Sequence, residues 1–197
     1  MVKVKICGLS RMCDIDVVNK ERPEYVGFVF APSPRRVTPM TALKLREGLR
    51  SDITAVGVFV DEEIENIVPL LRDGVIDAVQ LHGSEDENYI ETLRRAVDAP
   101  IIRSVAVEGC EDIERMRTSS ADCLLLEGKV RGKGFNWKLA ENIGRRYFLA
   151  GGLSPDNVME AVRITRPYAV DVSGGVETNG KKDAEKIKEF IRRARNA

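Results

Sequence analysis

Histidine and paired cysteines, the residues that supply most zinc sites, are scarce in this sequence. The chain has one histidine, His82, and its four cysteines, at positions 7, 13, 110 and 123, are far apart and form no Cys-x-x-Cys pair. A disulfide framework or a structural zinc site requires closely spaced or regularly paired cysteines, and a catalytic zinc site usually requires several histidines. The sequence therefore argues against a metal site and against structural disulfides.

Net charge and long apolar runs are also absent. Lysine plus arginine and aspartate plus glutamate both number 31, so the formal net charge is zero. Such a chain has no overall field that favours nucleic acid or an anionic membrane, and any anion must be bound locally. No apolar run approaches the roughly 18 residues of a membrane-spanning helix, and the first residues do not resemble a signal peptide. We expect a cytoplasmic protein with no nucleic-acid or membrane partner.

Apolar runs bounded by turn residues recur along the chain, as strands do in alternating α/β proteins. Residues 24–30 are almost continuously apolar, which is typical of a parallel strand covered on both faces. Eight strands are predicted, at residues 3–9, 24–30, 53–60, 77–83, 100–105, 122–127, 146–150 and 169–173.

Helices are predicted between these strands. Three have recognisable starts, namely Thr38 before Pro39, Asp61 as a cap, and Ser84 with Glu87 three residues later. The basic residues of the last helix are interpreted more simply as its solvated face than as a nucleic-acid patch. The predicted helices cover residues 14–18, 40–49 and 62–72, a segment from 84, residues 111–118, segments after 137 and from 154, and residues 181–195.

Eight strand–helix units favour a closed parallel barrel over an open doubly wound sheet. An open dinucleotide-binding sheet would carry Gly-x-Gly-x-x-Gly after its first strand, and residues 8–11 read Gly-Leu-Ser-Arg instead. With 197 residues, 43% of them hydrophobic, and no shift in composition, we expect one domain, residues 1–197, with an α/β fold of the (β/α)8 TIM-barrel class. The chain is short for this fold, so its loops must be lean, and the basic segment 128–134 should be the longest.

The first strand supplies the first candidate for chemistry. It alternates lysine with aliphatic residues, as a half-buried strand does, and ends in Cys7 and Gly8. The carboxyl ends of barrel strands hold ligands, so Cys7 is a catalytic candidate. The alternative is that a lone cysteine at such a place is a small buried hydrophobic residue.

Glycine pairs follow the last two strands, where barrels commonly bind phosphate. Backbone N–H groups approach an anion closely at such turns, although glycine pairs also simply make turns. The predicted phosphate-binding residues are Gly151, Gly152, Ser173, Gly174 and Gly175.

Titratable side chains are expected at the other strand ends, facing the phosphate. A thiol and a carboxylate suit a proton transfer. Each side chain also has a structural interpretation: an aspartate is often a cap, an arginine is often solvated, and a histidine is more often a hydrogen-bonded core residue. The residues concerned, besides Cys7, are Arg35, Asp61, His82, Arg103, Glu127 and Asp171.

Seven segments in this order resemble phosphoribosylanthranilate isomerases, (β/α)8 barrels of tryptophan biosynthesis, over essentially the whole chain. They are Lys-Ile-Cys-Gly-Leu at 5–9, Gly-Phe-Val-Phe at 27–30 with Ser-Pro-Arg at 33–35, Val-Gly-Val-Phe-Val at 56–60, Val-Gln-Leu-His-Gly at 79–83, Phe-Asn-Trp at 135–137, and the runs 150–158 and 170–177 that contain the glycine pairs.

The resemblance implies an Amadori rearrangement of N-(5'-phosphoribosyl)anthranilate to 1-(o-carboxyphenylamino)-1-deoxyribulose 5-phosphate, without a cofactor or a metal. By position, Glu127 is the acid that protonates the ribose ring oxygen and Cys7 is the base that removes the C2′ proton. Arg35 resembles the arginine that binds the anthranilate moiety, and His82 and Asp171 join it as candidate substrate-binding residues. The implied partner is a small phosphorylated substrate, and the chain is expected to be a monomer or a homodimer.

Three departures from the family pattern bear on the function. The chain has Glu127 where the family has aspartate, Arg-Gly-Lys-Gly at 131–134 where Gly-Gly-Thr-Gly is usual, and Ser-Gly-Gly at 173–175 for Ser-Ser-Gly. One alternative is therefore a non-catalytic phosphate-binding barrel. Another is the related phosphosugar isomerase of histidine biosynthesis, which uses two aspartates, and Cys7 argues against it.

Overall fold

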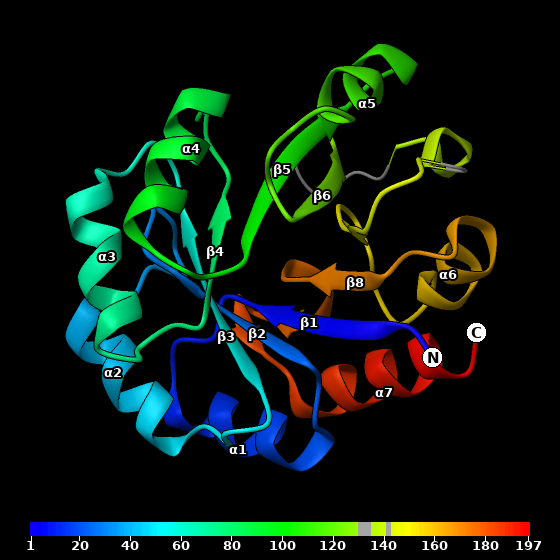
Figure 1. Cartoon of the computed structure of the whole chain (residues 1–197). Coiled ribbons are helices and arrows are strands. Elements are labelled where there is room, and N and C mark those ends of the chain that lie inside the picture. The colour runs from blue at the N-terminus through cyan, green and yellow to red at the C-terminus, as the bar shows by residue number, and fades with distance from the viewer. Residues whose placement is uncertain (130–134, 141–142) are drawn as a thin grey trace.

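Eight parallel strands close into a barrel in the computed structural model, which describes residues 1–129, 135–140 and 143–197 (Figure 1). Each strand pairs with the next in sequence, and β8 closes the barrel on β1 with Lys5 opposite Asp171. The predicted (β/α)8 barrel is confirmed. The strands are β1 Lys3–Cys7, β2 Tyr25–Val29, β3 Thr54–Phe59, β4 Ala78–Leu81, β5 Ile101–Val107, β6 Cys123–Gly128, β7 Tyr147–Leu149 and β8 Ala169–Val172.

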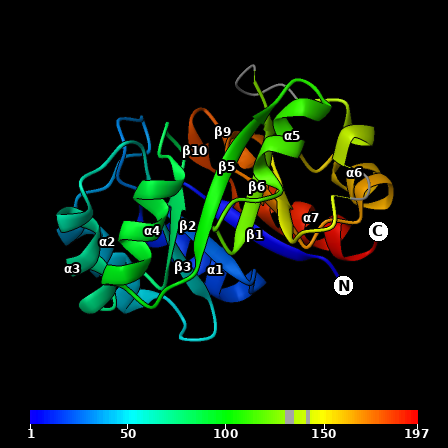
Figure 2. The same cartoon turned by 45° about the horizontal axis from the view of Figure 1, so that its top comes forward.

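Helices cover the outside of the barrel, as the two views in Figures 1 and 2 show. The last helix packs against α1 and β1, next to the start of the chain. Within the described residues, no helix has both the length and the apolar composition needed to cross a membrane. The α-helices are α1 Met12–Glu21, α2 Pro39–Gly48, α3 Ile64–Arg72, α4 Glu87–Ala96, α5 Cys110–Met116, α6 Val158–Thr165 and α7 Ala184–Arg195.

Alternation along the strands divides the apolar residues into two cores. Outward-facing residues such as Val4 and Ile6 join the helices in the larger core. A smaller core inside the barrel includes Val56, Leu125 and Phe148. Nearer the carboxyl ends of the strands, the interior is polar. This polar layer contains Lys5, Gln80 and Asp171, none more than 9% exposed.

The interpretation of the first strand as half-buried was wrong. Its alternation is real, but the lysine face points into the barrel, and Lys5 is 0% exposed. An unpaired buried ammonium group would be very unfavourable, so this placement requires a charged partner and further acceptors. The interior of the barrel supplies Asp171 and Gln80 for this purpose.

Helix starts were predicted with mixed success. Thr38 caps α2 as predicted, because its Oγ1 accepts from the N–H of Thr41 at 3.1 Å. Asp61 does not cap α3, which begins after Glu63, since Asp61 has a φ of 48° and accepts from Ser84 instead. That contact also occupies Ser84, and α4 begins later.

The caps of α4 and α7 are aspartates that sequence reasoning passed over. Asp86 accepts from the N–H of Tyr89, so Asp86 rather than Ser84 caps α4. Asp183 accepts from two N–H groups of the first turn of α7. The helix predicted from residue 181 therefore starts later, because Lys181–Lys182 forms a short strand, β10, that pairs with β9, Glu177–Thr178.

The sixth helix also differs from the prediction. After Phe135 and Asn136 the described chain forms a 3-10 helix, η1, at Trp137–Ala140. Residues 141–142 lie outside the described part of the chain, as does most of the basic segment, residues 130–134, for which the longest loop was predicted.

Candidate active site

Cys7 is the last residue of β1, with its thiol inside the carboxyl end of the barrel. The facing residue on β2 is Gly27, where a Cβ atom would lie 2.6 Å from the sulfur. No larger residue fits there without moving the thiol, so Gly27 provides the space that Cys7 occupies. The side chain of Cys7 is 7% exposed.

The environment of Cys7 keeps its thiol protonated at neutral pH. Burial raises the pKa of the Cys7 thiol, and the negative charge of Asp171 adds to this effect. The positive charges of Lys5 and Lys182 oppose it but do not cancel it. A thiolate base would form here only with additional positive charge nearby.

Lys5 lies two residues before Cys7 on the same face of β1. Its ammonium group donates to Asp171 Oδ1 at 2.9 Å and to Gln80 Oε1 at 2.7 Å. Burial alone lowers the pKa of Lys5, but the negative charge and the hydrogen bond of Asp171, joined by Cys7 when its thiol is ionised, outweigh burial and raise it. Lys5 is therefore a fixed positive charge in the interior. Sequence reasoning missed it, although its spacing of two from Cys7 was the available signal.

His82 and Glu127 meet at the mouth of the barrel. His82 Nε2 lies 2.8 Å from Glu127 Oε1, and both side chains are about one-third exposed, at 33% and 29%. The other ring nitrogen, Nδ1, lies 2.9 Å from Gln80 Nε2 and 2.8 Å from Ser104 Oγ. His82 is thus hydrogen-bonded, as its structural interpretation required, but one partner is the candidate acid.

Arg35, from the loop after β2, is held by a carboxylate that the sequence did not single out. Its Nε and Nη2 each donate to Glu177 at 2.6 Å. Lys182 donates to the same carboxylate at 2.6 Å and to the Ser173 carbonyl at 2.9 Å. Burial by itself raises the pKa of Glu177, but the hydrogen bonds and charges of Arg35 and Lys182 lower it to about 2.

The two glycine turns lie together at the ends of β7 and β8. Gly151 and Gly152 have φ values of 78° and 68°, in the left-handed region that favours glycine. At Gly175 a Cβ atom would overlap the carbonyl oxygen of Leu153, so the two loops touch through their backbones. Among the described hydrogen bonds, none uses the N–H of Gly151, Gly152, Gly174 or Gly175 as a donor.

Two candidates from the sequence lie outside this cluster. Arg103 forms an ion pair with Glu87 and donates to the Glu85 carbonyl, and Asp61 accepts from Ser84 at 2.7 Å. Both are structural links around the start of α4. Among the residues that the structure describes, no group of three histidine, cysteine, aspartate or glutamate side chains could hold a metal ion.

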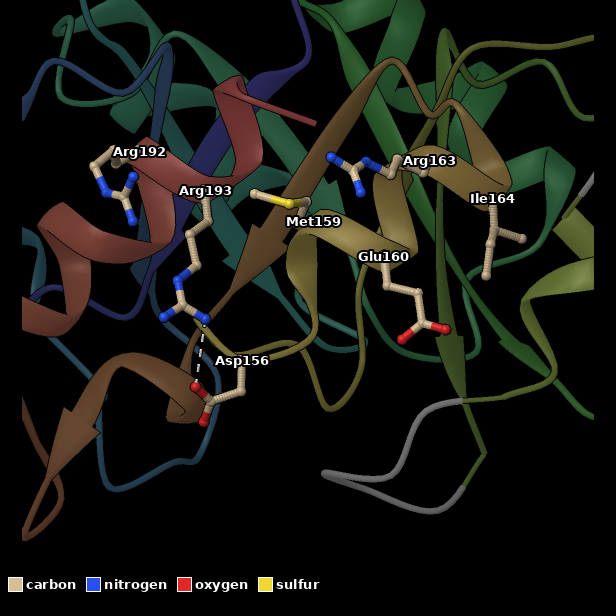
Figure 3. Close-up of a pocket in the computed structure, with 7 residues that line it drawn as sticks. All are labelled: Asp156, Met159, Glu160, Arg163, Ile164, Arg192 and Arg193. Atoms are coloured by element: carbon tan, nitrogen blue, oxygen red, sulfur yellow. Dashed lines mark ion pairs between the residues drawn. The ribbon is translucent and has the colours of Figure 1, made fainter.

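Two hollows lie away from the candidate residues. One, of about 530 Å³, lies between α6 and α7, where its charged wall includes Arg193 paired with Asp156 at 3.6 Å (Figure 3). The other, of about 450 Å³, lies at the amino ends of the strands and is lined by Tyr25, Cys123 and Tyr168 among others. Ligands bind at the opposite, carboxyl ends in barrels of this type, so we place the active site there.

Comparison with known proteins identifies the family. A family model described as N-(5'phosphoribosyl)anthranilate (PRA) isomerase matches residues 4–193. The chain belongs to this isomerase family. The N-(5'-phosphoribosyl)anthranilate isomerase of Endomicrobium trichonymphae is 44% identical over 198 residues, which cover 98% of each chain.

Solved structures agree with this assignment. Phosphoribosyl anthranilate isomerase from Thermotoga maritima is 37% identical over 100% of both chains, with a TM-score of 0.92. A phosphoribosyl anthranilate isomerase in complex with reduced 1-(o-carboxyphenylamino)-1-deoxyribulose 5-phosphate is also 37% identical over 100% of both chains, with a TM-score of 0.90.

One departure from the isomerase pattern is sterically neutral. At Gly174, where the family usually has serine, a Cβ atom would meet only Arg35 Nη2, at the ordinary contact distance of 3.6 Å. The second departure, at residues 131–134, lies outside the described residues. Glu127 is the departure that lies in the candidate site, where its carboxyl group contacts His82.

The Glu177 cluster predicts a pH-dependent contribution to stability. Glu177→Gln leaves Arg35 and Lys182 without their shared carboxylate, so we expect it to lower the free energy of unfolding at neutral pH by about 2–4 kcal/mol. Folding lowers the pKa of Glu177 from about 4.5 to about 2. The contribution of Glu177 to the free energy of unfolding is therefore present above about pH 4.5 and is lost as the pH falls toward 2.

Urea unfolding of both proteins at several pH values measures this difference. Glu189→Gln is the matched control, since Glu189 also pairs with two arginines but on the solvated face of α7, and its loss should be much smaller. If the free energy of unfolding of Glu177→Gln differed from that of the parent protein by the same amount at every pH, the pH-dependent contribution assigned to Glu177 would be contradicted.

Proposed function

We propose that this chain isomerises N-(5'-phosphoribosyl)anthranilate to 1-(o-carboxyphenylamino)-1-deoxyribulose 5-phosphate in tryptophan biosynthesis, with Glu127 as acid and Cys7 as base. The observation that carries the proposal is the placement of a buried thiol and a histidine-bound carboxyl group at the same end of a barrel of this family. Two proton-transfer groups are what an aldose–ketose rearrangement requires.

Ring opening is the first step. Protonated Glu127 donates its proton to the ribose ring oxygen, the bond from that oxygen to C1′ breaks, and the amine nitrogen supplies the electron pair that forms a cationic imine. Glu127 is left as a carboxylate. The N–H of His82, 2.8 Å from Oε1, stabilises that carboxylate by a charge-assisted hydrogen bond.

Proton abstraction follows at C2′. The cationic imine makes the C2′ proton acidic and supplies positive charge near Cys7, which favours the thiolate. The thiol first gives its proton to solvent. The thiolate then takes the C2′ proton, the C–H electron pair forms the C1′–C2′ double bond, and the imine becomes a neutral enolamine that tautomerises to the ketone. Lys5 and Lys182 also lower the energy of the thiolate, against the effect of burial.

The remaining residues bind the substrate in this proposal. Arg35, whose guanidinium orientation is set by Glu177, binds the anthranilate carboxylate. The amides of the glycine pairs, together with Ser173, bind the phosphate. Asp171 keeps Oδ1 on Lys5 and turns Oδ2 to a ribose hydroxyl.

The contact between Glu127 and His82 favours an active isomerase over a non-catalytic barrel, since an acid without a function would not need an ordered hydrogen-bond donor. The phosphorylated substrate is the one partner that the site requires. Assembly stays between a monomer and a homodimer, which light scattering in solution distinguishes.

The acid is tested by replacing Glu127. Glu127→Gln keeps the shape of the side chain but removes the proton, so kcat should fall by about 10²–10⁴-fold with less effect on KM. Glu127→Asp is the matched variant with the family's residue, and should stay within about tenfold of the parent, because only its reach differs. Fluorescence of the anthranilate adduct follows both reactions. A Glu127→Gln protein as fast as the parent would exclude Glu127 and make Asp171 the next acid to test.

The base is tested by Cys7→Ser, which nearly keeps volume but replaces the thiol by a far less acidic hydroxyl. We expect a fall in kcat of about 10²–10⁴-fold. Because burial raises the thiol pKa, the thiolate fraction grows between about pH 7 and pH 9. The residual kcat/KM of Glu127→Gln, which has no carboxyl proton to lose, should therefore increase with pH over this range. Exposed Cys13 provides the control, since Cys13→Ser should leave both rate and pH profile unchanged. A decrease in the kcat/KM of Glu127→Gln over this range would argue against a thiolate base.

The phosphate site is tested at Gly175. Gly175→Ala forces the β8 loop away from Leu153, so KM should rise by about tenfold or more while kcat changes less. Inorganic phosphate should compete with the substrate in the parent protein and more weakly in the variant. Gly109→Ala is a suitable control, because a Cβ there meets nothing within 4 Å. Absence of competition by phosphate even at tens of millimolar would contradict this placement.

A further inference from the structure

The side-chain amide of Gln80 has its orientation fixed from one end. Lys5 Nζ lies 2.7 Å from Gln80 Oε1, and an ammonium group donates hydrogen bonds but accepts none. The atom that faces Lys5 must therefore be the amide oxygen. The NH₂ group consequently points the other way, where it lies 2.9 Å from His82 Nδ1 and 3.3 Å from Ser104 Oγ.

This orientation determines the protonation of His82. The Ser104 hydroxyl, 2.8 Å from Nδ1, can donate to this nitrogen or accept from it, so it fits either tautomer. The NH₂ group of Gln80, at 2.9 Å, can only donate, so it requires an Nδ1 without a proton. The proton of the neutral ring is then on Nε2, which lies 2.8 Å from Glu127 Oε1. A chain of directed hydrogen bonds thus leads from the lysine–aspartate pair in the interior to the carboxyl group at the mouth.

We propose that Gln80 is a positioning residue for the reaction: held by Lys5, it fixes the Nε2–H tautomer of His82 and so places the acidic proton of Glu127 on Oε2. Oε1 accepts the imidazole N–H, so the carboxyl proton is on the other oxygen, which is free to face the substrate. This inference deepens the proposed function and rests on Glu127 being its acid.

The opposite tautomer would misdirect the proton. If Nδ1 carried the hydrogen, the lone pair of Nε2 would face Glu127, and a protonated Glu127 would donate to His82 instead of to the ring oxygen. A doubly protonated ring would hold Glu127 as a carboxylate. Both forms also place an N–H group against the NH₂ group of Gln80, so Gln80 disfavours both.

The tautomer is directly measurable, because His82 is the only histidine in the chain. In ¹⁵N-labelled protein, long-range proton–nitrogen correlation spectra distinguish a protonated from an unprotonated ring nitrogen, and the one imidazole needs no assignment by mutation. We expect the neutral ring with hydrogen on Nε2. The Nδ1–H form in the parent protein would overturn the inference.

Gln80→Glu is the informative variant, because it keeps the shape of the side chain and leaves an oxygen for Lys5. The second oxygen now faces Nδ1 and can only accept, so we expect Nδ1 to become protonated in the spectrum. The rate constant kcat should fall by about 10–100-fold, with KM within about threefold. Ser104→Ala removes the other contact to Nδ1, and should retain the Nε2–H form because Gln80 still donates.

A new charge in the interior could also act on Cys7 without His82. A His82→Ala background separates the two routes: if Gln80 acts through His82, adding Gln80→Glu there should change kcat by less than about threefold. A full additional loss in that background, or an unchanged tautomer in Gln80→Glu, would overturn the role assigned to Gln80.

The outcomes also distinguish this inference from the proposed function. If His82 has the Nε2–H tautomer but Glu127→Gln is fully active, the hydrogen-bond chain exists as described, but Glu127 is not the acid and the chain has no role in catalysis. The Nδ1–H tautomer together with an inactive Glu127→Gln would support the acid and refute the role of Gln80.

Discussion

The ion pair between Lys5 and Asp171 lies inside the barrel, where neither charge is in free contact with water. Transfer of two such charges from water is unfavourable by several kcal/mol each, and their attraction offsets this only when further hydrogen bonds complete the pair. Gln80 supplies the second acceptor for the ammonium group. Removing either charged partner would leave the other buried alone, typically at a cost of about 3–5 kcal/mol. The pair therefore constrains which residues its neighbouring strands may carry.

The candidate site has two parts at the same end of the barrel, one around Cys7 and the other around Glu127. On one side, Cys7 lies among Lys5, Lys182 and Asp171, charges that act on its thiol in opposite directions. On the other, Glu127 receives a hydrogen bond from His82. In the proposed mechanism Cys7 must be deprotonated and Glu127 protonated before they act, so the two groups need different surroundings, and the barrel provides these from different strands. Placing the two groups close together in one environment would not give them these different protonation states.

Much of this arrangement could be predicted from the sequence, because the signals were local. Cys7, Gly151 and Gly174 follow apolar runs directly, and the parallel barrel then brings strand ends together without further information. Lys5 was missed for a physical reason. Charged residues that alternate with apolar ones predict a solvent-exposed face of the strand. Only closure of the barrel turns that face inward, where Asp171 on β8, far away in the sequence, pairs with Lys5.

The helix starts and the Glu177 cluster were harder to predict for a similar reason. Ser84 satisfies the pattern of a capping box, but its N–H is used by Asp61, from a loop 23 residues earlier. Glu177 and Lys182 become neighbours through the short β9–β10 ladder, and they meet Arg35 only after the chain has closed. Such contacts depend on tertiary structure, which neither propensity nor spacing encodes.

Glutamate in place of aspartate at position 127 is compatible with this geometry. The backbone of β6 is confined at this point, since a Cβ at Gly151 would lie 2.9 Å from the Gly128 nitrogen and 3.2 Å from Glu127 Cβ. The strand therefore has little freedom to move, and the carboxyl position is set by side-chain length and by its partner at the far end. His82 holds Oε1 at 2.8 Å, so the additional methylene ends in a defined hydrogen bond instead of in solvent. A longer acid held at its tip is oriented by the histidine, and the histidine by the interior behind it. The departure from the family residue thus makes the polar layer inside the barrel more important to the position of the Glu127 carboxyl group, because the backbone alone no longer fixes it.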